Sequence, residues 1–346
     1  MDYLCAGGKD TLIPVANPRA SYIEHKEEID EAILRVLDSG SYILGEEVKK
    51  FEDSFARYIG VKYAISVASG TDALHLGMRA LGIGVGDEVI TVSHTAVATV
   101  SAIVMTGATP VLVDIEPKHF TMAPNKIKEA ITNKTKAILP VHIYGNPCEM
   151  LPIYVLAKKN KLLVIEDCAQ ATGASYFGNK VGSIGDIGCF SFYPTKNLGC
   201  FGDGGMVTTN SKKVAHKLHH LREYGWEKRY VSKIHGFNSR LDEIQAAVLN
   251  VKLKYLDSDN LRRKQLSGDE SISSVHHLDV IRVDKRDKVR KKLLDAGIHT
   301  AIHYPVPIHK QPGYKNLVRV SGKLTETDKA AKEVLSLPMY PQLSWM

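Results

Sequence analysis

Between residues 88 and 165, short apolar runs alternate with segments of helical character, and this alternation constrains the fold more than any other feature of the chain. We expect the apolar runs to form strands, at Glu88–Val92, Pro110–Ile115, Ala137–Val141 and Leu162–Ile165. The segments between them are expected to form helices, at Ala96–Thr106, Pro124–Ile131 and Ile153–Asn160. Strands this apolar, separated by helices, indicate a mainly parallel sheet covered by helices on both faces.

Further elements extend this pattern on both sides. Amphipathic helices are expected at residues 23–39 and 46–59, and Gly40 ends the first of them. Three more strands bring the expected sheet to seven strands, at Tyr63–Ala68, Asp186–Phe192 and Gly205–Thr209. The last two are short and close together along the chain, so we expect part of the sheet to be antiparallel or mixed.

The remainder of the chain predicts a second, smaller domain. A chain of 346 residues suits one large α/β domain plus a small one, which we place at residues 1–250 and 251–346. Helices are expected at Lys213–Tyr224 and Leu241–Leu256, the second leading into the small domain. That domain is expected to hold a strand and two helices, at Asp279–Val283, Lys285–Ala296 (capped by Asp284) and Thr325–Leu335.

Two chemically distinctive side chains follow two of the expected strands. The run that begins at Leu162 ends in Glu166 and Asp167, and the run that begins at Phe190 delivers Lys196 into a turn. A carboxylate at the end of a buried strand can keep a heterocyclic nitrogen protonated, and a lysine near apolar groups can form an imine with an aldehyde. Pyridoxal phosphate needs both functions, so this pair indicates a site for that cofactor.

A candidate anion site lies between the strand Tyr63–Ala68 and an expected helix at Asp72–Leu81. Gly70 and Thr71 are at the start of this helix, where backbone N–H groups and the helix dipole attract anions. The alternative, that Ser69 or Thr71 simply caps the helix, stays open.

Five segments together resemble a known family. They are Ser69–Leu74, Glu166–Gln170, Ser191–Lys196, Gly202–Gly205 and Asn238–Asp242. Their residues and order are similar to those of the DegT/DnrJ/EryC1/StrS family of pyridoxal-phosphate sugar aminotransferases. The resemblance spreads over most of the chain and implies a fold-type I transferase with a small C-terminal α+β domain.

The resemblance also implies roles for individual residues. Lys196 would hold the cofactor and later move a proton between the substrate carbon and the cofactor, while Asp167 would keep the pyridine nitrogen protonated. Gln170 would hydrogen-bond the phenolic oxygen of the ring. Ser191 would bind the phosphate together with Gly70 and Thr71. Asn238 would reach the phosphate from the neighbouring subunit, which implies a homodimer with shared active sites.

Two departures from the family pattern bear on these expectations. Ala96 stands where relatives often carry an aromatic residue that stacks on the ring, and His94 is a candidate to stack instead. The alternative is that His94 is a polar loop residue and that aliphatic groups cover the ring. The stretch 256–274 and the C-terminal end are shorter than in relatives, so we expect a shortened small domain.

Substrate contacts are expected from the segments that resemble the family's sugar-binding region. The candidates are His303, Tyr304, Tyr193 beside Lys196, and Lys310 acting with Arg222 or Arg229 on a diphosphate. The alternative for each is an ordinary exposed or loop residue.

The function implied by the resemblance is transfer of an amino group, with glutamate as donor, to a keto group on a nucleotide-linked deoxysugar. One alternative is a sugar dehydratase on the same fold, in which histidine replaces the lysine; Lys196 argues against it. A second alternative is a non-catalytic regulatory protein, which would predict loss of Lys196 or Asp167, and both are present.

Composition excludes several other classes. The net charge of +7 comes from scattered lysines and arginines, which favours an anionic small molecule over nucleic acid as partner. No apolar run has the length of a membrane span and no secretory signal is evident, so we expect a cytoplasmic protein. Five cysteines without C-x-x-C spacing predict no metal site. The glycines of 82–86 follow a helix, the reverse of a dinucleotide fingerprint.

Overall fold

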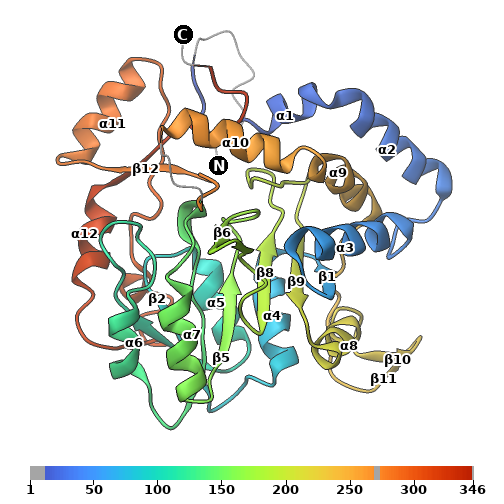
Figure 1. The fold of residues 1–346 in the computed structure, drawn as a ribbon, viewed down its shortest axis with the longest axis horizontal. Helices are drawn as coiled ribbons and strands as arrows, with labels where there is room; N and C mark the ends of the chain where they lie inside the picture. The colour runs from blue at the N-terminus through green and yellow to red at the C-terminus, as the bar shows by residue number, and fades with distance from the viewer. Residues whose placement is uncertain (1–11, 269–272, 345–346) are drawn as a thin grey trace.

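The computed structural model describes residues 12–268 and 273–344, and it is built around one eight-stranded sheet (Figure 1). The strands lie in the order β1-β9-β8-β5-β4-β2-β3-β13. Their bounds are Tyr63–Val67 (β1), Glu88–Val92 (β2), Thr109–Val113 (β3), Thr135–Ile138 (β4), Leu163–Asp167 (β5), Ile187–Ser191 (β8), Gly205–Thr209 (β9) and Arg319–Val320 (β13). The seven expected strands are therefore present, and the two-residue β13 extends the sheet at one edge.

The sheet is parallel except for one strand. β9 pairs antiparallel with both β1 and β8, while the pairs from β8 across to β13 are parallel. The expectation of a partly mixed sheet is confirmed, and the short connection between β8 and β9 explains it, because a parallel return needs a long crossover. The carboxyl ends of β1, β8, β5, β4, β2 and β3 consequently lie along one edge of the sheet.

Helices cover both faces of this sheet, as expected for buried parallel strands (Figure 1). One face carries α4 (Gly70–Leu81), α5 (Val97–Met105) and α8 (Lys212–Leu221), and the other carries α6 (Pro124–Ala130) and α7 (Met150–Lys159). α3 (Glu46–Ile59) packs beside β1, where Phe51 and Phe55 form an aromatic cluster with Phe190 and Phe192 around β8. These contacts fix the end of β8, which leads into Lys196.

Several expected boundaries are wrong. The first expected helix is broken at His25 into α1 (Pro18–Glu24) and α2 (Lys26–Ser39). The helix expected at Leu241–Leu256 is α9 (Glu243–Leu253), and a further helix that was not expected, α10 (Leu256–Ser267), follows it. Much of the stretch 256–274, which we expected to be shorter than in relatives, is therefore helical. Residues 269–272, also in that stretch, lie outside the described residues.

The C-terminal elements also differ from expectation. α12 (Thr325–Glu333) stops early because Val334–Leu337 pairs with β12 (Asp279–Arg282) as strand β14, which buries Val334 and Leu335. Lys285, with φ of 55°, occupies the N-cap position of α11 (Arg286–Asp295), where no side-chain cap bond forms. The predicted cap by Asp284 is therefore wrong.

The C-terminal part is tied to the large sheet by more than β13. The Asp114 carboxylate, just beyond β3, accepts hydrogen bonds from the backbone N–H groups of Glu326 (2.9 Å) and Thr327 (2.8 Å) at the start of α12. The Arg319 guanidinium on β13 pairs with Glu88 on β2 (3.0 Å). Division of the chain near residue 250 stays a prediction, and these contacts cross that boundary.

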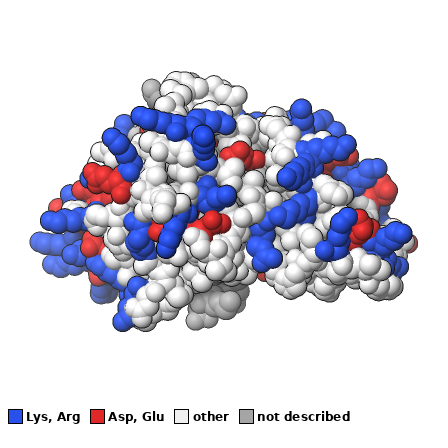
Figure 2. Space-filling model, turned by 90° about the horizontal axis from the view of Figure 1, so that it is seen from below, with Lys and Arg blue, Asp and Glu red and all other residues white. Residues whose placement is uncertain are grey.

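Surface charge is spread out on the face drawn in Figure 2, where Lys and Arg side chains alternate with acidic and neutral areas. No helix in the described ranges has the length and apolar character needed to cross a bilayer.

Candidate active site

The two residues singled out by the sequence lie at the same edge of the sheet. Asp167 is the last residue of β5, and β8 is its parallel neighbour, with Asp167 paired to Cys189. The chain leaves β8 after Ser191 and reaches Lys196 through a turn. Parallel neighbours end together, so the fold delivers the carboxylate and the amine to one region.

Asp167 is held by two hydrogen bonds. Its Oδ2 accepts from the Thr99 hydroxyl (2.8 Å) and its Oδ1 from the Ala169 backbone N–H (3.1 Å). Because the Thr99 proton is used there, its oxygen accepts from the Thr95 hydroxyl (2.8 Å). Burial raises the pKa of Asp167, while these bonds and the charge of Lys196 oppose that rise. Thr95 and Thr99 were not predicted, because nothing in a local pattern points from α5 to β5.

Lys196 carries an amine suited to imine formation. Burial lowers the pKa of Lys196 to about 8, and the negative charge of Asp167 limits the shift. The charges of Lys196 and Asp167 act on each other's pKa, so the two groups share one desolvated region. A pKa near 8 leaves a useful fraction of neutral amine at neutral pH.

A cavity of about 480 Å³ opens in front of Lys196. Its lining includes three of the predicted substrate residues, Tyr193, His303 and Tyr304, and the predicted ring-binding residue Gln170. These residues come from three distant parts of the chain. The cavity also includes His277, which sequence analysis missed because a lone histidine in an irregular segment carries no pattern.

Gln170 has a fixed orientation at this cavity. Its Oε1 accepts from the Tyr144 backbone N–H (2.7 Å), and its Nε2 donates to the Tyr304 hydroxyl (3.0 Å). One Nε2 proton is left to donate elsewhere. Burial raises the pKa of Tyr304 to about 12, so this phenol is neutral at physiological pH.

Three histidines line the cavity, and two of them, His277 and His303, are neutral. The Asn197 Nδ2 group donates to Asn260 (2.7 Å) and to the Val275 carbonyl (2.9 Å), so its Oδ1 accepts from His277 Nδ1 (3.0 Å). Burial and the charge of Lys196 lower the pKa of His303 to about 4 and that of His277 well below its ordinary value. Both therefore act as neutral hydrogen-bonding groups near pH 7.

The residues of the predicted anion site lie at the start of α4 and beside it. The Ser69 side chain caps the helix by accepting from the Asp72 N–H (3.1 Å), so the capping alternative holds for Ser69. The N–H groups of Gly70 and Thr71 lie in the first turn, where an α-helix offers them no partner of its own. Gly70 lies against Ser191, because a Cβ at Gly70 would come within 2.6 Å of the Ser191 Cβ. The absence of a Cβ at position 70 therefore lets Ser191 lie against the first turn of α4, and their joint role in binding an anion stays a prediction.

Asn238 lies next to this helix start. Its neighbour Ser239 donates a hydrogen bond to the Asp72 carboxylate (2.7 Å) and accepts one from the Ala68 N–H (3.1 Å). The chain segment of Asn238 is therefore anchored beside the N-terminus of α4.

Other candidates are engaged elsewhere. The Arg222 guanidinium is buried against Glu52 (2.5 Å) and the Ser66 carbonyl (3.1 Å), so the expected diphosphate contact of Arg222 is replaced by an internal ion pair. Lys310 pairs with Asp328 (2.7 Å), and Arg229 lies on the exposed hairpin of β10 (Trp226–Lys228) and β11 (Val231–Ser232).

His94 is not part of the cavity lining. It is buried, its Nε2 bonds the Tyr144 hydroxyl (2.6 Å), and burial lowers its pKa to about 4. His94 therefore lies in a packed polar contact with Tyr144, and its role in stacking on the ring stays a prediction.

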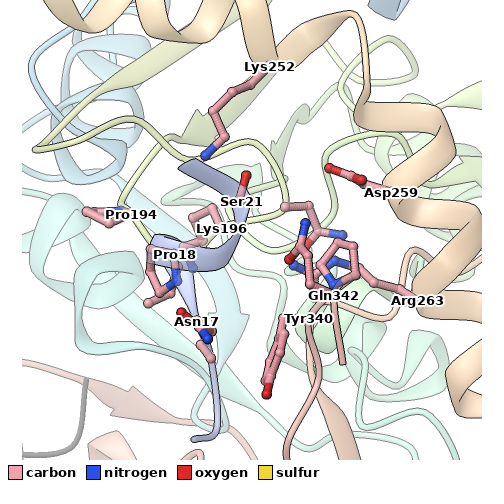
Figure 3. A pocket seen from close by; sticks show the side chains of 14 residues that line it. Asn17, Pro18, Ser21, Pro194, Lys196, Lys252, Asp259, Arg263, Tyr340 and Gln342 are labelled. Atoms are coloured by element: carbon pink, nitrogen blue, oxygen red, sulfur yellow. The ribbon is translucent and has the colours of Figure 1, made fainter. Parts of the chain in front are cut away.

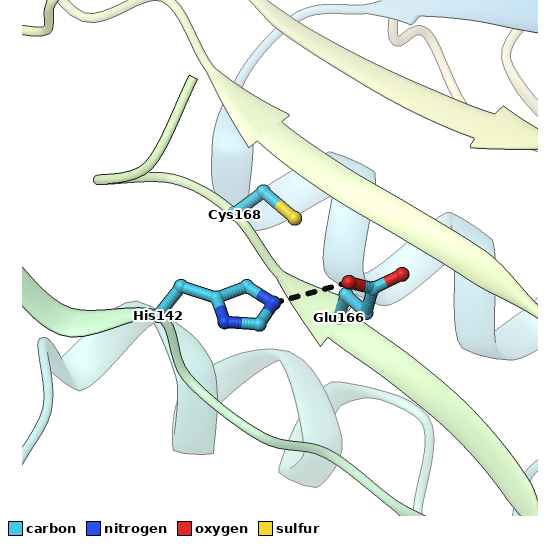
Figure 4. Close-up of side chains that lie close together, drawn as sticks. All are labelled: His142, Glu166 and Cys168. Carbon is cyan, nitrogen blue, oxygen red and sulfur yellow. Dashed lines mark hydrogen bonds and ion pairs between the residues drawn. The ribbon is translucent and has the colours of Figure 1, made fainter. Parts of the chain in front are cut away.

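One cluster of potential metal ligands lies beside Asp167 in the described part of the chain, namely His142, Glu166 and Cys168 (Figure 4). The Glu166 carboxylate accepts from three backbone N–H groups, those of Gly182, Ile184 and Gly185 (2.7–2.9 Å), and from His142 Nε2 (3.1 Å). The other ring nitrogen of His142 accepts from the Cys148 N–H (2.9 Å). The carboxylate and imidazole are saturated, so this cluster is a structural network that holds the end of β5.

Comparison with known proteins was consistent with this geometry. A family model described as the DegT/DnrJ/EryC1/StrS aminotransferase family matches residues 23–270 and 266–345. The chain is 44% identical to the dTDP-3-amino-3,4,6-trideoxy-alpha-D-glucose transaminase of Streptomyces venezuelae, over 96% of this chain and 92% of that protein. It is 47% identical to the dTDP-3-amino-3,6-dideoxy-alpha-D-galactopyranose transaminase of Aneurinibacillus thermoaerophilus, over 96% of both.

A solved structure extends the similarity to three dimensions. The crystal structure of S. venezuelae DesV in complex with a ketimine intermediate superposes with a TM-score of 0.93 at 44% identity, covering 97% of this chain and 95% of that one.

Proposed function

Since the chain belongs to the DegT/DnrJ/EryC1/StrS aminotransferase family, we propose that Lys196 and Asp167 are the centre of its active site. The protein is a pyridoxal-phosphate-dependent aminotransferase that acts on nucleotide-linked sugars. The observation that supports the residue assignment is that the buried Asp167 ends β5 and that Lys196, whose pKa is lowered by burial, follows β8, the parallel neighbour of β5.

The residues present fit the cofactor. When bound, pyridoxal phosphate supplies an aldehyde for imine formation and a protonated ring that accepts electrons from a substrate carbon. Asp167, kept in place by Thr99, would hold the proton on the ring nitrogen. The remaining proton of Gln170 Nε2 suits the phenolic oxygen, and the Gly70, Thr71 and Ser191 donors suit the phosphate.

Lys196 would act twice. Its amine would hold the cofactor through the aldehyde group, and the low pKa of Lys196 keeps part of that amine neutral and able to react. Once displaced by an amino substrate, Nζ would accept the proton from the substrate carbon that carries nitrogen and deliver it to the cofactor carbon.

The substrates would enter the 480 Å³ cavity. His303 and Tyr304 offer neutral hydrogen-bonding groups that suit the hydroxyl and keto groups of a sugar, and Tyr193 and Arg290 also line the cavity. We propose a nucleotide-linked deoxysugar as acceptor and L-glutamate as donor. We also propose a homodimer in which Asn238 of one subunit serves the phosphate of the other.

A spectroscopic experiment tests this assignment. The holoenzyme should absorb at roughly 410–430 nm through the linkage between Lys196 and the cofactor, and glutamate should bleach that band. A nucleotide-linked keto-sugar should then restore it, and a panel of such sugars would identify the acceptor. Lys196→Ala should lack the band in the resting protein. A band that persists with every amino donor would contradict the proposed reaction.

A further inference from the structure

A second, much smaller cavity lies beside the turn that carries Lys196, and it shares Ala16, Thr195 and Lys196 with the lining of the substrate cavity. It has a volume of about 30 Å³, and residues of α1, α9, α10 and the C-terminal segment line it (Figure 3). The polar side chains that line it include Asn17, Ser21, Lys196, Lys252, Asp259 and Arg263. Apart from Lys196, the proposed function uses none of them.

The charges around this cavity are not balanced. Lys252 is 7% exposed and Arg263 is 6% exposed, and Asp259 is the acidic residue in the lining. With Lys196 included, three basic side chains face one carboxylate. Leaving buried cations without compensating charge is costly, because the protein interior solvates them poorly.

Hydrogen bonding is incomplete on the same two cations. Lys252 Nζ donates to the Gly199 carbonyl (2.6 Å), and Arg263 Nη1 donates to the Met339 carbonyl (2.9 Å). Arg263 Nε is buried and has no partner among the described residues. Burial lowers the pKa of Lys252 to about 8 and that of Arg263 to about 10, which is the response of cations that lack a counter-charge. Buried donors are nearly always hydrogen-bonded, so the free N–H of this buried guanidinium indicates that an acceptor binds there.

We propose that this cavity binds one small inorganic anion of halide size, held between Lys252 and Arg263. The cavity has room for about one or two water-sized particles, so a chloride or bromide ion fits and a sulfate with its four oxygens does not. One negative charge offsets the excess cation on Lys252 and Arg263 beyond Asp259. It also supplies the acceptor that Arg263 Nε lacks.

The site bears on the active centre through the turn that it supports. Lys252 grips the Gly199 carbonyl, three residues beyond Lys196, and the Cys200 N–H bonds the Phe192 carbonyl (2.8 Å) across the base of the same turn. A bound anion fixes Lys252 in its charged form and thereby stabilises the loop that presents Lys196.

Diffraction from holoenzyme crystals tests the proposal directly. Crystals soaked in bromide and measured at the bromine edge should show an anomalous peak in contact with Lys252 Nζ and Arg263 Nε. Crystals soaked in sulfate at equal ionic strength should show none in this cavity. If crystals in high bromide show no anomalous peak and only water between Lys252 and Arg263, the proposal is overturned.

Thermal unfolding of the holoenzyme gives a second measurement. A ligand that binds only the native state raises the melting temperature, so chloride or bromide should raise it by about 2 °C relative to gluconate at equal ionic strength. Lys252→Met should abolish the halide difference. Lys254→Met is the matched control, because Lys254 is exposed and pairs with Glu28 outside the cavity, and it should keep the difference. Equal melting temperatures in halide and gluconate for the unaltered protein would count against the site.

Discussion

At the scale of single residues, the active centre is a desolvated pair of an acid and a base. Burial favours the neutral form of each, and the charge of each partner favours the charged form of the other. Burial raises the pKa of Asp167 and lowers that of Lys196, and the attraction between the two opposes both shifts. With the cofactor bound, Lys196 would no longer present a full positive charge to Asp167, and a protonated ring nitrogen would supply that charge instead.

The low pKa of Lys196 predicts the pH dependence of cofactor uptake by the apoprotein. The neutral amine is the attacking form, so the uptake rate should rise about tenfold per pH unit below about 8 and level off above it. The same lowered pKa means that the unfolded chain binds more protons between about pH 8 and 10.5, so apoprotein stability should gain from rising pH in that window. Stopped-flow absorbance measures the rate; a plateau reached only above pH 10 would show an unperturbed lysine.

Thr99 predicts a second effect at residue scale. Thr99→Val keeps the shape but removes the hydroxyl that holds Asp167 Oδ2, so turnover should fall on the order of tenfold. The carboxylate also loses a stabilising bond, and the absorbance band should titrate at a different pH. Thr99→Ser, which keeps the hydroxyl, is the control and should restore both properties. Normal turnover and titration in Thr99→Val would show that Asp167 needs no such support.

At the scale of elements, the sequence predicted the sheet well and the local ends poorly. The strands from Tyr63 to Thr209 were predictable because buried parallel strands read as apolar runs between helices. The split at His25 and the change from α12 into β14 were not, because both depend on distant packing partners. Local periodicity also continued the last helix through Val334 and Leu335, which tertiary pairing places in a strand.

The start of α3 shows why such contacts escape sequence analysis. The N-cap residue of α3 is Gly45, which has no side chain to cap the helix. The Glu243 carboxylate on α9 accepts instead from the N–H groups of Gly45 (2.7 Å), Glu47 (2.9 Å) and Val48 (2.9 Å). Val48 and Glu243 are 195 residues apart, so no cap pattern in the sequence points to this bond.

This cap predicts a stability effect. Glu243→Ala leaves three partly or fully buried N–H groups unsatisfied and should lower the free energy of unfolding by about 1–3 kcal/mol. Urea unfolding followed by circular dichroism measures the change. Asp242→Ala removes the neighbouring, exposed carboxylate, which makes no cap bond, and should change little. Similar losses in both variants would mean that the cap is energetically unimportant.

At the scale of the whole molecule, the site depends on segments that meet only in the folded chain. Asp167, Lys196 and the turn of Gly70 were found from sequence because each follows an apolar strand. His277 and the ion pair of Arg222 with Glu52 were not, since neither lies in a pattern that local chemistry would single out. The active site is also proposed to depend on a second copy of the chain, because Asn238 of one subunit would serve the phosphate of the other.

A hybrid dimer tests that relation. Homodimers of Lys196→Ala and homodimers of Asn238→Ala should each have low turnover when assayed at limiting cofactor. Co-expression of the two chains with different tags gives the hybrid. If Asn238 serves the opposite subunit, the purified hybrid contains one site with both lesions and one with neither. Turnover should then return to about half that of the unaltered dimer.

The turnover of the same hybrid distinguishes the alternative, in which Asn238 serves its own subunit. If Asn238 serves its own subunit, each site of the hybrid carries one lesion, and turnover cannot exceed the mean of the two parent dimers. In that case Asn238 would reach the phosphate of its own subunit from the position beside α4 where Ser239 anchors it. Sedimentation of the unaltered protein at assay concentrations completes the test, because a fully active monomer would remove any need for a second subunit.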